Sequence, residues 1–124
     1  FRFHSRAVNR FETLLSQYTY VCLANILYQG SHMYDLTGFQ RDLLYVVAGL
    51  EEPHGLAIKE ELEQYYESEI HHGRLYPNLD TLVDKGLIDK GERDQRTNFY
   101  TVTRRGRREI EARREWELEY VDLD

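Results

Sequence analysis

Three polar side chains follow one another at helical spacing in the second half of the chain: Arg74, Asn78 and Thr81. Residues three or four positions apart share one face of an α-helix. A guanidinium, a carboxamide and a hydroxyl on one face can hydrogen-bond with the base edges and phosphates of a nucleic acid. His72 precedes them, and Tyr76 lies among them, where it either contacts a nucleic-acid backbone or packs in the core. The pattern predicts a nucleic-acid contact, and the alternative is an ordinary polar surface helix.

A second group of arginines follows in the sequence. Arg93 and Arg96 lie in a polar stretch between two short apolar runs, so we expect them at the tip of a β-hairpin. Such a hairpin can place arginine against phosphates or in the minor groove, and the alternative is a charged, solvated turn. Arg104 and Arg105 open the last helix, where positive charge is unfavourable with the helix dipole. We therefore expect these two to meet phosphate.

The helix that carries Arg74 has a defined beginning and end. Pro77 is tolerated only near the start of a helix, because deeper in it would remove a backbone hydrogen bond. Gly86 can adopt the left-handed conformation that ends a helix. The apolar positions have helical spacing and predict one buried face: Leu75, Leu79, Leu82 and Val83. The segment from His72 to Gly86 therefore predicts a recognition helix with a buried back.

Two helices precede it. Thr37 and Gln40 form a capping-box pattern for a helix over about 38–50. Pro53 and Gly55 end that helix, and a second helix is expected over 56–67, followed by a turn in which Ile70 fills the core. The expected buried positions of the two helices are Phe39, Leu43, Val46, Val47 and Leu50, and Ile58, Leu62, Tyr65 and Tyr66.

The period then changes. Residues 87–92 and 98–102 predict two strands, and Thr103 is the expected N-cap of a last helix over 104–120. That helix has no clean apolar stripe, so we expect it to pack against a second subunit through Ile110, Trp116, Tyr120 and Val121. The fold class expected is mainly α with a small β-hairpin: a winged helix-turn-helix plus a C-terminal dimerisation helix. The domains expected are 34–102 for the winged helix and 103–124 for the dimerisation helix.

Residues 1–33 differ from the rest. They hold three arginines and one acid, whereas residues 34–124 hold twenty-one acids and thirteen basic residues. The segment ends in Gly-Ser-His-Met33, which is typical of a protease-site and cloning remnant, so we expect residues 1–33 to be a non-native extension. The alternative is a native helix, because Phe11, Leu14, Tyr18 and Cys22 have roughly helical spacing.

Composition bounds the function. The net charge of −6 argues against a simple nucleic-acid binder, because most of these are basic. Thirteen arginines accompany only three lysines, a balance typical of proteins from high salt or of any acidic protein. The single cysteine excludes an intrachain disulfide, and no apolar run is long enough to span a membrane. We expect a cytoplasmic protein.

Catalytic and metal-binding patterns are weak. His71 and His72 lie near Glu69, but adjacent histidines point apart on a helix and a third ligand with suitable spacing is missing. The sequence has no nucleophile–base signature and no phosphate-cradling glycine loop. We expect no enzyme activity, no metal and no cofactor.

Four segments resemble the PadR-like family of winged-helix transcription regulators: Gly55-Leu-Ala-Ile58, Gly73-Arg-Leu-Tyr-Pro-Asn-Leu79, Leu82-Val-Asp-Lys-Gly-Leu-Ile88 and Tyr100-Thr-Val-Thr-Arg-Arg-Gly106. The acidic, lysine-poor form resembles the haloarchaeal branch of the family and its stress-responsive regulators. The resemblance implies a homodimer that binds a pseudo-palindromic operator in double-stranded DNA and usually represses transcription.

The sequence therefore leaves two alternative functions. The first is a sequence-specific DNA-binding regulator adapted to high salt, in which salt cations lie between acidic residues such as Asp80 and Asp84 and the DNA phosphates. The second is a winged helix used for protein–protein contact, whose acidic surface faces a partner protein. A DNA-binding protein must gather its arginines on one face despite the acidic total, whereas the protein-binding module has no such requirement.

Overall fold

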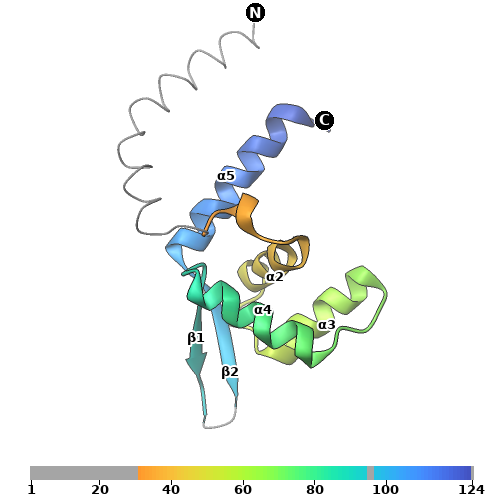
Figure 1. The fold of residues 1–124 in the computed structure, drawn as a ribbon, viewed down its shortest axis with the longest axis vertical. Helices are drawn as coiled ribbons and strands as arrows, with labels where there is room; N and C mark the ends of the chain where they lie inside the picture. The colour runs from red at the N-terminus through yellow and green to blue at the C-terminus, as the bar shows by residue number, and fades with distance from the viewer. Residues whose placement is uncertain (1–30, 95–96, 124) are drawn as a thin grey trace, which may run out of the picture. The chain divides into compact units, whose positions relative to one another are not determined.

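The computed structural model describes residues 31–94 and 97–123. Their elements, in chain order, are η1 (Met33–Asp35), α2 (Gly38–Gly49), α3 (Gly55–Tyr66), α4 (His72–Asp84), β1 (Ile88–Glu92), β2 (Asn98–Val102) and α5 (Arg104–Tyr120). In Figure 1 the hairpin β1–β2 extends in one direction and α5 runs in the other. The expected mainly α winged helix-turn-helix with a hairpin and a C-terminal helix is confirmed. The expectations for residues 1–30, including Cys22, and for Arg96 lie outside the described residues.

Side-chain caps begin three of the helices. Thr37 and Gln40 form the predicted capping box: the Gln40 amide donates to Thr37 Oγ1 at 3.2 Å, and the Thr37 amide donates to Gln40 Oε1 at 3.1 Å. Thr103 Oγ1 accepts from the Gly106 amide at 3.0 Å, as expected for an N-cap. The cap of α3 is His54, whose Nδ1 accepts from the Ala57 amide at 3.1 Å. This last cap was not predicted, because histidine is not among the usual capping residues.

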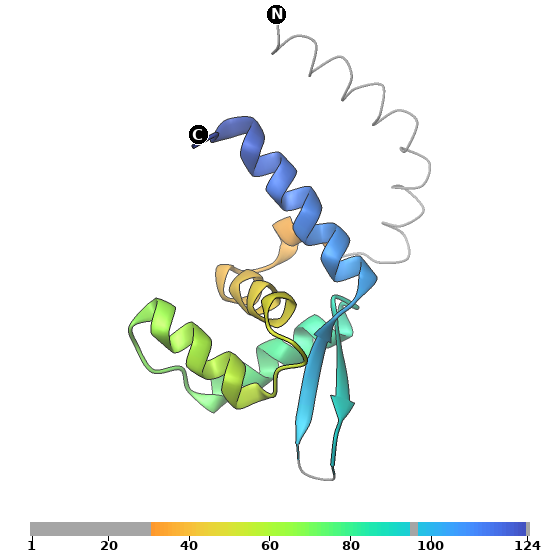
Figure 2. The same ribbon diagram turned by 180° about the vertical axis from the view of Figure 1, so that it is seen from behind.

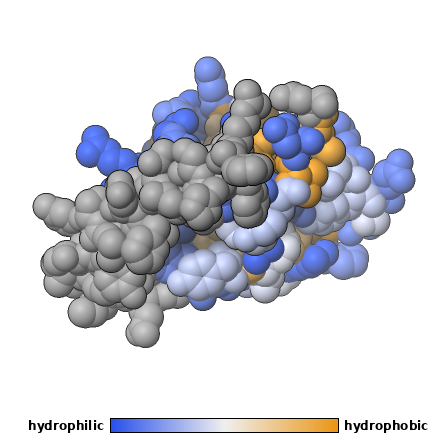
Figure 3. Space-filling view, turned by 90° about the horizontal axis from the view of Figure 1, so that it is seen from above, coloured by the Kyte–Doolittle hydropathy of each residue, from blue (hydrophilic) through white to orange (hydrophobic). Residues whose placement is uncertain are grey.

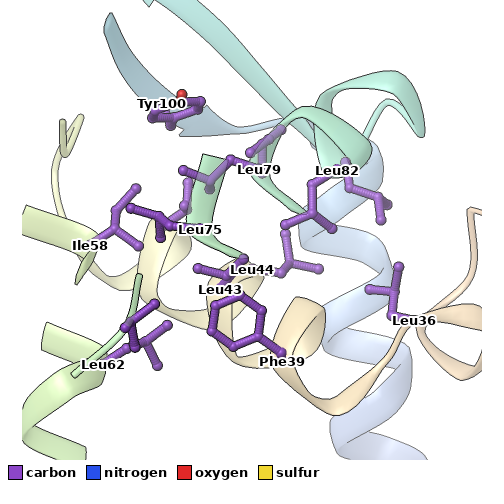
Figure 4. Packing of buried hydrophobic residues seen from close by; sticks show 14 of the residues in the cluster. Leu36, Phe39, Leu43, Leu44, Ile58, Leu62, Leu75, Leu79, Leu82 and Tyr100 are labelled. Carbon is purple, nitrogen blue, oxygen red and sulfur yellow. The ribbon is translucent and has the colours of Figure 1, made fainter. Parts of the chain in front are cut away.

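One apolar core joins α2, α3, α4 and the hairpin, as Figure 4 shows, and Ile110 of α5 packs against it. Leu43 and Leu44 of α2 are both fully buried, although only Leu43 was expected to be. Ile70 is 1% exposed and fills the core between α3 and α4, as expected. The expected burial of Tyr65 is wrong, since 77% of its surface is exposed. Val46 and Leu50, both expected to be buried, are only partly buried.

The hairpin is antiparallel and pairs Ile88 with Val102 at its base and Glu92 with Asn98 near its tip. The segment before α3 pairs with β2 over a short stretch: the Tyr100 amide donates to the Pro53 carbonyl at 2.9 Å. Tyr100 itself is 1% exposed, and burial together with nearby Asp80 raises its pKa to about 12. The sheet is therefore tied into the helical core rather than attached only through its ends.

Two glycines join α4, the hairpin and α5. Gly86 has a φ of 75°, which a residue with a Cβ adopts only with strain, and it ends the segment that begins at α4 as expected. Gly106 of α5 lies against the segment that leads into β1, because a Cβ placed on it would overlap the Leu87 carbonyl oxygen. Thr103 Oγ1 donates to the Gly86 carbonyl at 2.7 Å in the same place. The start of α5 is therefore held close to the end of α4.

Gly106→Ala should destabilise the fold, because the new methyl group would have to displace backbone rather than a flexible side chain. We expect a loss of about 1–3 kcal/mol or more in the free energy of unfolding, measured by urea denaturation. Gly49→Ala in α2 is the matched control, since nothing lies within 4 Å of its Cβ position. Equal unfolding free energies for the two variants would show that α5 does not depend on this close contact.

Candidate nucleic-acid interface

The solvent-facing side of α4 differs from the one expected. Leu75, Leu79 and Leu82 are fully buried, which confirms the predicted back of this helix. The exposed positions at i, i+4, i+7 and i+11 opposite to them are Gly73, Pro77, Asp80 and Asp84. We call these four residues the exposed stripe. It carries two carboxylates and no cation, so the basic side chains of α4 lie to the side of it.

Arg74 lies on the flank that faces α2. Its guanidinium carbon is 4.0 Å from the centre of the Phe39 ring, which is a cation–π distance. Phe39 in turn packs against the Tyr66 ring, with 6.2 Å between the ring centres. The Tyr66 hydroxyl donates to Asp42, and burial, then this hydrogen bond, raises the pKa of Tyr66 to about 12. Arg74 is still exposed to solvent, but its direction is set by the aromatic pair beneath it.

Asn78 and Thr81 are both engaged within the protein. Asn78 Oδ1 accepts from Gln40 Nε2 at 3.0 Å, and Asn78 Nδ2 donates to the Arg74 carbonyl at 2.7 Å. Thr81 Oγ1 donates to the Pro77 carbonyl at 3.0 Å. The expected polar front of Arg74, Asn78 and Thr81 is therefore turned partly toward α2.

His72 and Tyr76 lie on the opposite flank of α4. His72 is exposed and meets the Tyr76 ring edge-on, with 5.6 Å between the ring centres. Tyr76 is partly buried against the core. A Cβ on Gly55 would lie 2.6 Å from the Tyr76 hydroxyl oxygen, so the glycine at the start of α3 makes room for this ring. Of the two roles left open for Tyr76, the packing role describes where its ring lies.

The turn between α3 and α4 is fixed by Glu63. Its Oε2 accepts from the Ile70 amide at 2.8 Å and from Lys59 Nζ at 2.9 Å. The Ile70 amide first, and then Lys59, lower the pKa of the Glu63 carboxyl. Glu67 ends α3 in the left-handed conformation, with a φ of 55°. The sequence shows the i, i+4 spacing of Lys59 and Glu63, but the contact with Ile70 depends on how the turn folds.

The hairpin carries Arg93 beside its tip, and this arginine is paired within the chain. Arg93 Nη2 lies 2.6 Å from Glu52 Oε2, in the loop before α3, and both side chains are at least half exposed. The guanidinium also lies 5.3 Å from the centre of the Phe99 ring. Lys90 of β1 lies 3.5 Å from Asp80 of the exposed stripe. Hairpin and α4 therefore meet through opposite charges.

The arginines at the start of α5 separate into two environments. Arg104 is exposed, as the predicted phosphate contact requires. Arg105 is partly buried, and its Nε donates to Ser31 Oγ at 3.0 Å. Ser31 is 2% exposed, so Arg105 is engaged with the segment that leads into η1 rather than presented to solvent.

The outer half of α5 exposes apolar side chains. Trp116 is 44%, Tyr120 71% and Val121 56% exposed, and they line an open hollow together with Leu118 and Leu123. Ile110, nearer the start of the helix, instead packs against the core of its own chain. Figure 3, seen from above, shows hydrophobic surface in orange among hydrophilic residues on this side of the molecule.

Within residues 31–94 and 97–123, no group of three or more His, Cys, Asp or Glu side chains could hold a metal ion. No helix in the same part of the chain is long and apolar enough to cross a membrane.

The architecture matches one family of regulators. A model of the transcriptional regulator PadR-like family matches residues 43–112. The chain belongs to this family. It is a winged-helix transcription regulator, and the match ends inside α5, so the apolar outer end of that helix lies beyond the part that defines the family.

Two solved structures show which regulators the chain resembles. RosR of H. salinarum is 52% identical over 73% of this chain and 81% of its own, with a TM-score of 0.68. A complex structure, hsRosR-S4, is 48% identical over 78% of this chain and 82% of its own, with a TM-score of 0.70. The expected resemblance to haloarchaeal PadR-like regulators is confirmed and is of the RosR type.

A more distant structure shares the fold alone. FabT of Streptococcus pneumoniae in complex with DNA is 19% identical over 96% of this chain and 85% of its own, with a TM-score of 0.51. Comparison with curated proteins gives no match.

Proposed function

We propose that this PadR-like regulator is a homodimeric repressor that binds a pseudo-palindromic operator in the cytoplasm. The observation that carries the proposal is the setting of α4: its leucine back is fully buried, and the exposed stripe on its other side is open to solvent. Figure 2 shows α3 and α4 together on one side of the molecule with the hairpin beside them. A helix of this kind suits the major groove, with the hairpin over the adjacent minor groove. Identity of 52% to RosR and the fold shared with a DNA-bound FabT support it.

The cations available to DNA flank the exposed stripe. Arg74 lies on the α2 side and Arg93 beside the hairpin tip, and both guanidiniums are exposed to solvent. Arg96 belongs to the same tip in the sequence. Arg104 is exposed at the start of α5. The proposed contacts are thus phosphate contacts around α4, which position a protein on DNA.

Arg74→Ala and Arg96→Ala should each weaken binding to DNA from upstream of the protein's own gene. The loss expected for each is about tenfold, or about 1.4 kcal/mol, because one arginine contact to a base or phosphate is removed. Fluorescence anisotropy in high salt measures it, and the unfolding transition should not change. Arg107→Ala removes the same charge from α5 and should have little effect. Wild-type affinity in both test variants would favour the rival function, a winged helix that binds protein.

The exposed stripe of α4 is acidic. Asp80 and Asp84 both lie on the side of α4 that would enter the groove, and Asp84 is exposed. Carboxylates and neighbouring phosphates repel each other unless cations lie between them. We infer that the complex takes up salt cations there, so its affinity is retained at molar salt, in contrast to ordinary DNA binding.

The salt dependence can be measured directly. Between about 0.5 and 3 M potassium chloride, operator affinity of the wild-type protein should stay constant or rise, because cations taken up offset those released from DNA. Asp80→Asn with Asp84→Asn should make the slope of log affinity against log salt more negative by about one for each cation lost. Glu111→Gln, on an exposed part of α5, is the control. A steep fall of wild-type affinity with salt would refute cation uptake.

We infer that the outer half of α5 is the dimer interface. Monomeric proteins rarely leave several large apolar side chains together in solvent, as the outer half of α5 does. Trp116 and Tyr120 contact each other, with ring centres 5.2 Å apart, and form one aromatic surface. A second α5 of the same chain would cover it and would place two copies of α4 for two operator half-sites.

Trp116→Ala with Tyr120→Ala should convert the dimer to a monomer. Truncation of two aromatic side chains in an interface raises the dimer dissociation constant by about 30-fold or more. Sedimentation equilibrium of the protein without DNA measures this constant. Glu115→Ala, exposed on the same helix, should leave it unchanged. A wild-type protein that sediments as a monomer would contradict this assignment.

A further inference from the structure

A continuous chain of hydrogen bonds joins the start of α2 to the middle of α4. Gln40 forms its centre, because its carboxamide is used at both ends. Oε1 accepts from the Thr37 amide at 3.1 Å and so closes the capping box of α2. Nε2 donates to Asn78 Oδ1 at 3.0 Å and so reaches α4, thirty-eight residues later in the chain. Gln40 thus caps one helix and binds another with a single side chain.

Asn78 extends the chain and is used at both ends as well. Its Oδ1 accepts from Gln40, and its Nδ2 donates to the Arg74 carbonyl at 2.7 Å, one turn earlier in α4. Neither amide can rotate by 180° without placing two oxygens or two NH₂ groups against each other. The hydrogen-bond directions of this pair are therefore fixed by the backbone at both ends of the chain.

We propose that Gln40 is a positioning residue that sets the rotation of α4 about its own axis, and thereby which side chains of α4 meet the operator. The proposal rests on the proposed DNA-binding function. Packing of Leu75, Leu79 and Leu82 into the core is non-directional and permits small rotations of the helix. A hydrogen bond from α2 is directional and removes that freedom.

A rotation of α4 would displace Arg74, which links the hydrogen-bond chain to the proposed DNA contact. Its carbonyl is the last acceptor in the chain, and its guanidinium stacks on Phe39 of α2, 4.0 Å from the ring centre. A rotation of α4 would therefore move both the backbone and the cation that flanks the exposed stripe. Asn78 is assigned to this network and not to a base, although its residue type suggested base contact.

Gln40→Glu separates the two roles of Gln40. Glutamate at this position completes a capping box as well as glutamine does, and its charge suits a helix N-terminus. It has no hydrogen to donate, so it would face Asn78 Oδ1 with an oxygen. If Asn78 rotates to donate to the glutamate, it loses its bond to the Arg74 carbonyl. The variant therefore keeps the cap and breaks the link to α4.

Thr37→Ala is the matched control and does the reverse. It removes the Thr37 Oγ1 acceptor of the Gln40 amide but leaves the Thr37 amide that donates to Gln40 Oε1. The side chain of Gln40 can therefore still donate to Asn78. This variant should lower the melting temperature by about 4–8 °C, as loss of one helix cap does in a domain of this size.

The test compares affinity for upstream operator DNA with affinity for a scrambled duplex at one salt concentration. In Gln40→Glu the ratio of the two affinities should fall about fivefold or more, as loss of one directional bond implies, while the melting temperature falls by about the same amount as in Thr37→Ala, because each variant loses one hydrogen bond. The added negative charge weakens both duplexes alike and leaves the ratio unaffected. In Thr37→Ala the melting temperature should fall and the ratio should stay at the wild-type value. An unchanged affinity ratio in Gln40→Glu, or an equal fall of the affinity ratio in both variants, would overturn the proposal.

A measurement without DNA keeps the two hypotheses apart. Gln40→Glu should shift the NMR signals of the Asn78 side-chain amide and of the backbone amides of residues 74–81, whereas Thr37→Ala should shift mainly those of the start of α2. A wild-type protein with no preference for the operator would refute the proposed function, and the NMR comparison would still decide whether Gln40 positions α4. Unshifted α4 signals in Gln40→Glu would refute the positioning role.

Discussion

The burial of the leucine face of α4 is the constraint from which the remaining features of the interface follow. With Leu75, Leu79 and Leu82 inside the core, one line of positions must face solvent, and in this chain that line contains Gly73, Pro77, Asp80 and Asp84. The groups suited to nucleic acid are displaced to the flanks, where other elements hold them. Phe39 and Gln40 of α2 hold one flank, and Gly55, which receives the Tyr76 ring, borders the other. The chemistry of the surface is thus decided by which residue of α4 is buried, not by which residue types α4 contains.

The negative charge of an acidic protein opposes its contact with DNA. Two basic side chains near α4 are already paired with carboxylates of the same chain. Arg93 lies beside Glu52, and Lys90 lies beside Asp80. These pairs are exposed and contribute about 0–1 kcal/mol each, so phosphate can replace the carboxylate with little loss. The carboxylate that is released then lies close to the phosphate. The proposed uptake of mobile cations at this position would neutralise both charges and offset the usual loss of affinity in high salt.

Local features of the fold followed from the sequence. The caps at Thr37 and Thr103, the helix end at Gly86 and the leucine spacing of α4 depend on residues a few positions apart, and all are present. The orientation of the site residues did not follow, because their partners are distant in the sequence. Asn78 meets Gln40, Arg93 meets Glu52 and Arg105 meets Ser31, with separations of 38, 41 and 74 residues. Spacing identifies which side chains share a helix face, but the neighbouring element decides whether that face is available.

The strength of these internal contacts separates side chains that can turn to DNA from those that cannot. To contact DNA, Arg93 gives up one exposed ion pair. The exposed Arg74 guanidinium can donate to DNA from its position on the Phe39 ring. Asn78 would give up two hydrogen bonds of about 1 kcal/mol each and would leave Gln40 without its acceptor. The same two bonds hold α2 and α4 together, so turning Asn78 to a base would loosen the helix that presents it. Contact through the arginines and restraint through Asn78 are therefore compatible, whereas base contact by Asn78 would work against the placement of α4.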